Sequence, residues 1–212
     1  MPTENGTTKR PYEKRARAEQ ERETRRRIIE AAIDLHGTVG PARTTISGIA
    51  DRAGVRRATV YRHFPDERTL FLGCSGTWAE RNPPPDPAAW ASIPDPPARL
   101  AAALDALYGW YEQVEPMLTA VLRDIEAVPM VAEVQERRYA YLAAVEDGLA
   151  SGWGARGNAA KRLRATIGLA LDFLAWRALH ERGLSRRDAV AVMTSAVTPA
   201  GRLRRDRPTA AR

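Results

Sequence analysis

The sequence has a single cysteine, Cys74, among its 212 residues. One thiol excludes an internal disulfide and any metal site built from several cysteines. The chain also lacks a run of about 18 apolar residues and the basic-then-apolar pattern of a secretory signal peptide. We therefore expect a protein that neither crosses a membrane nor is secreted, with the cytoplasm as its default location.

Motifs that carry enzyme chemistry are missing as well. The sequence has no H-E-x-x-H zinc signature, no glycine-rich phosphate loop and no pairing of a nucleophile with a base. We therefore expect no enzyme activity, no metal and no cofactor. A helical enzyme acting on an apolar small molecule stays open as an alternative.

Strand-like alternation of apolar and polar residues is absent, and so is any internal repeat. Helical spacing is present instead. The stretch "RRRIIEAAIDLHGTVG" places Ile28, Ala32 and Leu35 on one broad apolar face, and Gly37 and Gly40 end the pattern. These features predict an all-α protein.

Composition divides the chain into five parts. Residues 1–22 are charged without apolar periodicity, which predicts a flexible arm, and residues 23–81 form a compact helical block. Residues 82–97, "NPPPDPAAWASIPDPP", hold seven prolines and predict a linker or extended loop. Residues 98–198 are helical again, and residues 199–212 form a basic tail.

The stretch "TTISGIADRAGVRRATVYRHFP" predicts two short helices joined by a tight turn. Thr44 or Thr45 is a good N-cap, Gly54 suits the turn, and Phe64 closes the second helix. The first helix has apolar residues at i, i+3, i+4 and i+7: Ile46, Ile49, Ala50 and Ala53. Such a pair is a helix-turn-helix, whose second helix can enter the DNA major groove.

Positive charge is concentrated on this segment. Residues 43–63 hold Arg43, Arg52 and three further arginines against one acid, Asp51, and the whole chain carries a net charge of +7. A solvated surface face would explain the arginines, but a polyanionic partner also fits the charge. On the second hypothesis Thr44 and Thr45 and the outer face of the second helix contact DNA, with these residues exposed: Arg56, Arg57, Ala58, Thr59, Tyr61, Arg62 and His63.

Residues 23–78 resemble the DNA-binding domain of TetR-type (TetR/AcrR) transcriptional regulators. The resemblance covers about a quarter of the chain, and "EPMLTAVLRD", residues 115–124, is more weakly similar to the family's ligand-binding half. It implies an all-α homodimer with an N-terminal helix-turn-helix domain and a helical effector-binding and dimerisation domain. The matching segments are "IIEAAIDL", Gly40, "TT" at 44–45, "IA" at 49–50, "AGV" at 53–55, "ATVYRHFP" at 58–65 and Leu70.

Three positions depart from the family's pattern. His36 stands where an aromatic core residue is usual, and Arg56 replaces the common serine cap of the recognition helix. Glu67 stands where a lysine is common, and its carboxylate would repel the DNA backbone. Asp66 remains a suitable N-cap for the next helix.

The second half predicts helices near residues 98–115, 116–127, 129–151, 158–182 and 185–198. The stretch "LRATIGLALDFLAWRAL", residues 163–179, is apolar nearly all round, which indicates burial on more than one side. We expect one side, with Leu169, Phe173 and Trp176, to face its own domain. The other side and the last helix would form a four-helix dimer interface through Ile167, Leu171, Leu174, Val190, Met193 and Val197.

The same half supplies candidate effector-binding residues. Asp172 is the one acid in the apolar helix, so it either pairs with an arginine or orients a polar group at the edge of a pocket. The aromatic and methionine residues could equally be ordinary core. The candidates are Trp110, Met117, Val121, Tyr139, Asp172, Phe173 and Trp176.

Together these features predict a DNA-binding transcriptional regulator. The expected partners are a double-stranded, pseudo-palindromic DNA operator, a second copy of the chain, and a small apolar or aromatic effector that releases the repressor. An effector-independent DNA-binding protein is the other alternative. The sequence identifies neither the operator nor the effector.

Overall fold

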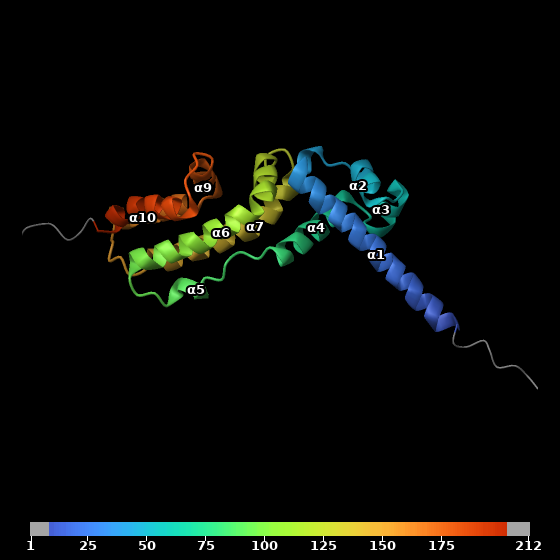
Figure 1. Ribbon diagram of the computed structural model, residues 1–212, viewed down its shortest axis with the longest axis horizontal. Helices are drawn as coiled ribbons and strands as arrows, with labels where there is room; N and C mark the ends of the chain where they lie inside the picture. Colours follow the sequence, from blue (N-terminus) through green and yellow to red (C-terminus); the bar gives the residue numbers. More distant parts are fainter. Residues whose placement is uncertain (1–8, 203–212) are drawn as a thin grey trace, which may run out of the picture. The chain divides into compact units, whose positions relative to one another are not determined.

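The computed structural model describes residues 9–202, with side chains between residues 12 and 199, and no strand occurs in that range. The expected all-α class is confirmed. The first elements along the chain are α1 (Lys9–Thr38), the short 3-10 helix η1 (Pro41–Arg43), α2 (Ile46–Ala53), α3 (Arg57–His63) and α4 (Glu67–Arg81) (Figure 1). The remaining elements are α5 (Ala88–Ala91), α6 (Pro96–Arg123), α7 (Pro129–Ala150), α8 (Asn158–Leu171), α9 (Phe173–His180) and α10 (Arg186–Arg202).

The chain forms two compact units. The N-terminal unit holds the residues up to 82 together with 116–134, and the C-terminal unit holds 83–115 and the residues from 135 onward. The expectation of one helical domain over 98–198 is therefore wrong. The reason lies in long-range contacts: Asp124 bonds to the backbone of Ala42, and Glu133 pairs with Arg68.

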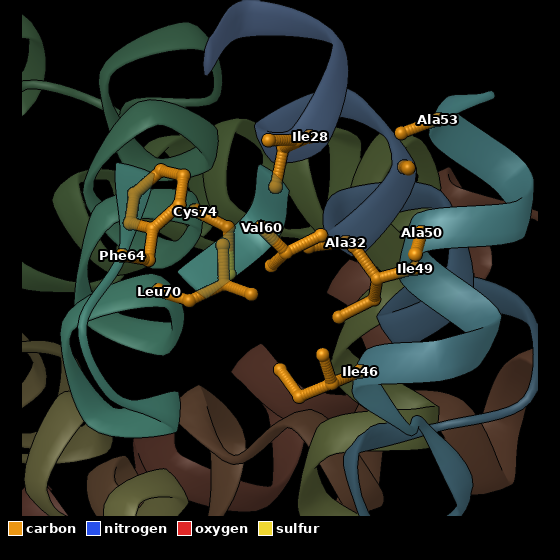
Figure 2. Close-up of a cluster of buried hydrophobic side chains, with 11 residues drawn as sticks. Ile28, Ala32, Ile46, Ile49, Ala50, Ala53, Val60, Phe64, Leu70 and Cys74 are labelled. Atoms are coloured by element: carbon orange, nitrogen blue, oxygen red, sulfur yellow. The ribbon is translucent and has the colours of Figure 1, made fainter. Parts of the chain in front are cut away.

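The core of the N-terminal unit joins α1, α2, α3 and α4. Figure 2 shows apolar side chains of these helices converging on one another. All four residues of the predicted α2 pattern are buried, with at most 7% of their surface exposed. Burial of apolar surface therefore holds the two short helices in place. The core residues are Ile28, Ala31, Ala32, Ile46, Ile49, Ala50, Ala53, Val60, Phe64, Leu70 and Cys74.

Local caps fix where these helices begin and end. The Thr45 hydroxyl accepts a hydrogen bond from Gly48 N at 3.0 Å, and Asp66 accepts one from Thr69 N at 2.6 Å. Gly54 ends α2 with φ of +63°, a conformation that favours glycine. Arg56 makes no side-chain cap bond, as its departure from serine implies.

Helix α1 begins at Lys9, so residues 9–22 are helical rather than the expected flexible arm. The earlier part of that arm, residues 1–8, lies outside the described residues, as do residues 203–212 of the basic tail. Ion pairs one turn apart lie along this stretch, Arg17 with Glu21 and Arg22 with Glu19, and such exposed pairs favour a helix only weakly. They stabilise a stretch that has no apolar face of its own.

Other expected boundaries also change. The helices expected at 98–115 and 116–127 are the single helix α6, which continues through Pro116. The expected linker over 82–97 contains α5, whose Trp90 is buried in the C-terminal unit. The Tyr141 hydroxyl donates to Pro85 O at 2.8 Å, which further ties this proline-rich segment to that unit.

Candidate functional site

Helix α3 has one buried side and one exposed side. Val60 is fully buried, whereas Arg56, Arg57, Ala58 and Arg62 are exposed. Tyr61 exposes 37% of its surface, and Thr59 and His63 are half-buried. The outer side of α3 therefore presents three arginines next to a tyrosine hydroxyl.

Arg57 and Tyr61 contact each other on this face. Arg57 Nη2 donates to the Tyr61 hydroxyl at 3.2 Å, and the guanidinium lies 5.5 Å from the centroid of the tyrosine ring. The pair lies one helical turn apart, at the spacing that brings side chains together. The contact holds the planar Arg57 guanidinium, with its N–H donors, beside the Tyr61 hydroxyl on one exposed surface.

The two threonines before α2 have different roles. Thr44 donates its hydroxyl hydrogen to Gly40 O at 2.8 Å. Thr45 uses its oxygen to accept from Gly48 N, and its side chain is exposed. A hydroxyl that accepts in this way keeps its own hydrogen for a further acceptor. Thr45, rather than Thr44, can therefore donate to an external group.

Two arginines of α1, which the sequence analysis missed, support the helix-turn-helix. Arg25 lies 4.2 Å from the centroid of the Phe64 ring, and Arg27 donates to the backbone of Ala53 and Gly54. The cluster "RETRRR", directly before the apolar face of α1, was the available signal. These contacts join α1 to the turn after α2 and to the end of α3.

His63 lies beside this arginine cluster. Burial lowers its pKa most, and the charge of Arg62 lowers it further; Glu21 raises it by less than that, and Arg25 lowers it least. The imidazole is therefore uncharged at neutral pH, and it adds a hydrogen-bonding group rather than a charge to the face. Its Nε2 is buried and has no hydrogen-bond partner within the described part of the chain.

The loop that leads into α2 is held by the end of α6. The Asp124 carboxylate is buried and accepts from Ala42 N at 2.9 Å and from Arg123 Nε at 2.7 Å. Arg123 also donates to Val39 O at 2.9 Å. Gly40 lies between them with φ of +94°, where a Cβ would meet both side chains. The hydrogen bonds from Arg123 hold the pKa of Asp124 below its usual value.

His36 occupies the core position expected for an aromatic residue. Its ring centroid lies 5.1 Å from that of Phe71, and its Nδ1 lies 3.5 Å from Cys74 Sγ. Burial lowers the pKa of His36 to about 4 and raises that of the Cys74 thiol to about 11. Both groups are therefore neutral at physiological pH and serve as core.

An aromatic cluster forms the centre of the C-terminal unit. The Tyr111 ring lies 5.3 Å from Phe173 and 5.5 Å from Trp176, centroid to centroid, and Phe173 lies 5.4 Å from Trp176. Trp110 packs 5.5 Å from Tyr111. Tyr108 and Tyr111 donate their hydroxyls to Ala170 O at 2.8 Å and Leu171 O at 2.6 Å. These are carbonyls of the last turn of α8.

Asp172 has a different role from the one expected. The helix expected over 158–182 breaks there into α8 and α9, and the Asp172 side chain is exposed. Its Oδ1 accepts from Leu174 N at 2.8 Å and Ala175 N at 3.0 Å, which makes it the N-cap of α9. The two tyrosine hydroxyls satisfy the carbonyls that the break frees. Neither expected role, a pair with an arginine or a polar group at a pocket edge, matches this exposed helix cap.

The other candidate effector residues fall into separate places. Trp110, Phe173 and Trp176 meet in the aromatic cluster. Tyr139 exposes 48% of its surface and lies under the guanidinium of its neighbour. Met117 and Val121 belong to the N-terminal unit instead, so the structure does not bring them together with the others.

The residues expected at the dimer interface fall into two groups, one buried and one partly or largely exposed. Ile167, Leu171 and Val197 are buried within their own chain, with at most 2% exposed, so they cannot form an interface as expected. Val190 and Met193 are half-buried, and Leu174 is 56% exposed. The break at Asp172 changes the helical phase of α9 relative to α8. The exposed large apolar residues of α8, α9 and α10 are Leu169, Leu174 and Val192. The expectation that Leu169 faces its own domain is therefore wrong.

Two kinds of feature are absent from the described range. Between residues 9 and 202 no helix combines the length and hydropathy needed to cross a bilayer. Over the same residues no three histidine, cysteine, aspartate or glutamate side chains are grouped as metal ligands would be.

Comparison with known proteins places residues 28–74 in the sequence profile "Bacterial regulatory proteins, tetR family". The chain is 46% identical over 52 residues to the HTH-type transcriptional regulator TtgR of Pseudomonas putida, covering 24% of this chain and 25% of that protein. It is 41% identical over 58 residues to the probable acrEF/envCD operon repressor of Escherichia coli (strain K12), covering 27% and 26%. The matches thus span about a quarter of these relatives.

Solved structures are similar over most of the chain. A TetR-like transcriptional regulator from Rhodococcus sp. RHA1 superposes with a TM-score of 0.59 at 17% identity, over 86% of this chain and 97% of that one. NalD, the secondary repressor of the MexAB-OprM multidrug efflux pump in Pseudomonas aeruginosa, gives 0.54 at 20% identity, over 86% and 97%. At these identities the likeness concerns the fold. The expected TetR-type resemblance is confirmed.

Proposed function

We propose that this chain, with its TetR-type helix-turn-helix, is a DNA-binding transcriptional repressor that a small apolar or aromatic molecule releases from its operator. The observation that carries this proposal is the two-sided helix α3. Val60 anchors one side in the core, while Arg57 and Tyr61 stand together on the other. A helix that is both fixed and basic suits the major groove.

Each exposed group has a distinct task on DNA. The Arg57 fork matches the two acceptors of guanine in the major groove, which would specify a base. The hydroxyls of Tyr61 and Thr45 donate to phosphate oxygens and set the register of the helix on the duplex. Arg56 and Arg62 add charge that attracts the backbone regardless of sequence.

A dimer follows from this mode of binding. One seven-residue recognition helix contacts few base pairs, and two related helices can occupy successive major grooves about one DNA turn apart. The exposed residues Leu169, Leu174 and Val192 support an interface between two copies through α8, α9 and α10.

Release by an effector needs a ligand that binds two conformations with different affinity. The aromatic cluster around Tyr111 and Trp176 is the candidate site. Its rings are buried against one another, so an aromatic ligand would bind a conformation in which they separate. Helices α6 and α7 contribute residues to both units, so they offer a covalent path between ligand and DNA. The names of two similar proteins, both repressors, favour repression.

Selection from a random-sequence DNA pool tests the proposal. The full-length chain should enrich one pseudo-palindromic sequence, whose half-sites are centred about 10 base pairs apart. Enrichment of nothing beyond the starting pool would reject a sequence-specific regulator. An effector-independent DNA-binding protein would enrich the same kind of site, but no aromatic ligand would release it from that site.

A chromosomal operator would also imply a cytoplasmic protein.

A further inference from the structure

Arg138 of α7 is a half-buried cation. Its Nε donates to the Gln135 side-chain oxygen at 2.6 Å, and Gln135 itself is buried. Its Nη1 is buried and has no hydrogen-bond partner among the described residues. Over the same residues Arg138 forms no ion pair. The guanidinium carbon also lies 4.8 Å from the centroid of the neighbouring Tyr139 ring.

Two other arginines of this unit are paired with acids, whereas Arg99 donates to the backbone carbonyls of Ile93 and Ser151. Arg177, also half-buried, pairs with Glu181 at 2.8 Å and lies 3.8 Å from a Glu115 carboxylate oxygen. Arg164 pairs with acids of α7. Removing a cation from water without an opposite charge is unfavourable, and a buried N–H without an acceptor adds to that cost. An apolar side chain at position 138 would avoid both.

Arg138 belongs to the same compact unit as the aromatic cluster. Burial raises the pKa of Tyr111, and the positive charge of Arg138 opposes that rise. The Tyr111 hydroxyl cannot supply the missing counter-charge, because it is neutral and donates to Leu171 O. Asp172, the acid that also acts on Tyr111, is exposed and caps α9.

We propose that Arg138 is the anion-binding residue of the effector site, and that the effector is an aromatic or apolar molecule carrying a carboxylate or sulfonate. The acidic group would accept from the free Nη1, and the ring system would pack against the Tyr111 cluster. Arginine suits this task because its planar fork stays charged and binds two oxygens side by side. The inference rests on the effector site of the proposed function and names the ligand class.

A matched pair of fluorescent probes tests this on the full-length chain. The anionic probe is 8-anilinonaphthalene-1-sulfonate, and the neutral one is N-phenyl-1-naphthylamine, which has the same rings without the sulfonate. The wild-type protein should bind the sulfonate more tightly than the amine. Arg138→Met should weaken sulfonate binding by at least about tenfold and change binding of the neutral probe by less than about twofold. Arg138→Lys should restore part of the difference.

The control is Arg137→Met, which removes an exposed charge from the neighbouring position and should leave both affinities unchanged. Equal binding of the two probes by wild type, or equal losses with Arg138→Met and Arg137→Met, would overturn the proposal. A structural role for Arg138 predicts a lower melting temperature for Arg138→Met, whereas an anion site predicts an unchanged or higher one.

This test is separate from that of DNA binding. Without any probe, Arg138→Met should bind the DNA selected by wild type with unchanged affinity. A wild-type chain that selects no DNA sequence but loses sulfonate affinity on Arg138→Met would support the anion site and reject the proposed regulator. A chain that selects a DNA sequence, but whose affinity for the sulfonate is the same in wild type and in Arg138→Met, would support the proposed regulator and reject the anion site.

Discussion

Two residues one turn apart on α3 carry different parts of DNA recognition in this account. Arg57→Ala should cost about 1–3 kcal/mol at one base pair and relax preference there, because a bidentate contact to guanine is lost. Tyr61→Phe should instead weaken binding to all sequences by similar amounts, since it removes a phosphate contact. Titrations of the selected duplex and of single-base variants measure both effects. A uniform loss for Arg57→Ala would contradict its assignment to a base.

His36 provides a pH-dependent contribution to stability. Its pKa is about 4 in the folded protein against an ordinary value of 6.5, because burial disfavours the charged imidazole. The unfolded chain therefore binds more protons between these values, so stability is complete above pH 6.5 and falls as pH drops toward 4. The free energy of unfolding should decline by up to about 1.4 kcal/mol per pH unit in this window.

His36→Phe should remove this slope while keeping an aromatic ring beside Phe71. Denaturant unfolding at several pH values compares the two proteins. Parallel pH profiles for His36→Phe and wild type would show that other groups cause the acid sensitivity.

At the scale of elements, the break between α8 and α9 depends on one side chain. Asp172→Ala should cost about 0.5–2 kcal/mol of stability, because Leu174 N and Ala175 N lose their acceptor. Asp172→Asn should cost much less, since asparagine is also a good N-cap. Thermal melts of both variants check this. An equal loss for the two would indicate that the negative charge matters, rather than the cap.

Local signals predicted the helix-turn-helix well. The α2 spacing, the Thr45 and Asp66 caps and the Gly54 turn each depend on residues a few positions apart, and the structure has all of them. The helix "IGLALDFLAW" was harder, because its composition favours one continuous apolar helix. The break is stabilised instead by the hydroxyls of Tyr108 and Tyr111, which donate to the backbone carbonyls that the break leaves without a helical partner. These tyrosines lie about sixty positions away in the sequence.

The same limit applies to the candidate site: features that depend on one helix could be predicted, and contacts between distant parts of the chain could not. The exposed side of α3 could be predicted because one helix determines which residues share a face. The division of α6 between two units could not, since it depends on contacts such as Asp124 with Ala42. Met117 and Val121 were grouped with the aromatic residues for that reason. Arg138 had no signal at all in the sequence, because a missing partner appears only after folding.

For the whole molecule, the position of the dimer surface can be tested by introducing a glutamate at one of two positions. Leu174→Glu adds a carboxylate to an exposed apolar position, so it should dissociate a dimer and leave the chain folded. Ile167→Glu places the charge in the interior, where an unpaired carboxylate is costly, and should unfold the C-terminal unit instead. Sedimentation and circular dichroism distinguish the two. A Leu174→Glu protein that remains dimeric would place the interface elsewhere.

In the proposed complex, two copies of α3 bind adjacent major grooves of one duplex. Hydroxyl-radical footprinting of the wild-type chain on its selected DNA tests this most directly. We expect two protected patches centred about 10 base pairs apart on one side of the helix, at two chains per duplex, with both patches lost in Arg57→Ala. A single patch, protection without fixed spacing, or an unchanged footprint in Arg57→Ala would contradict it.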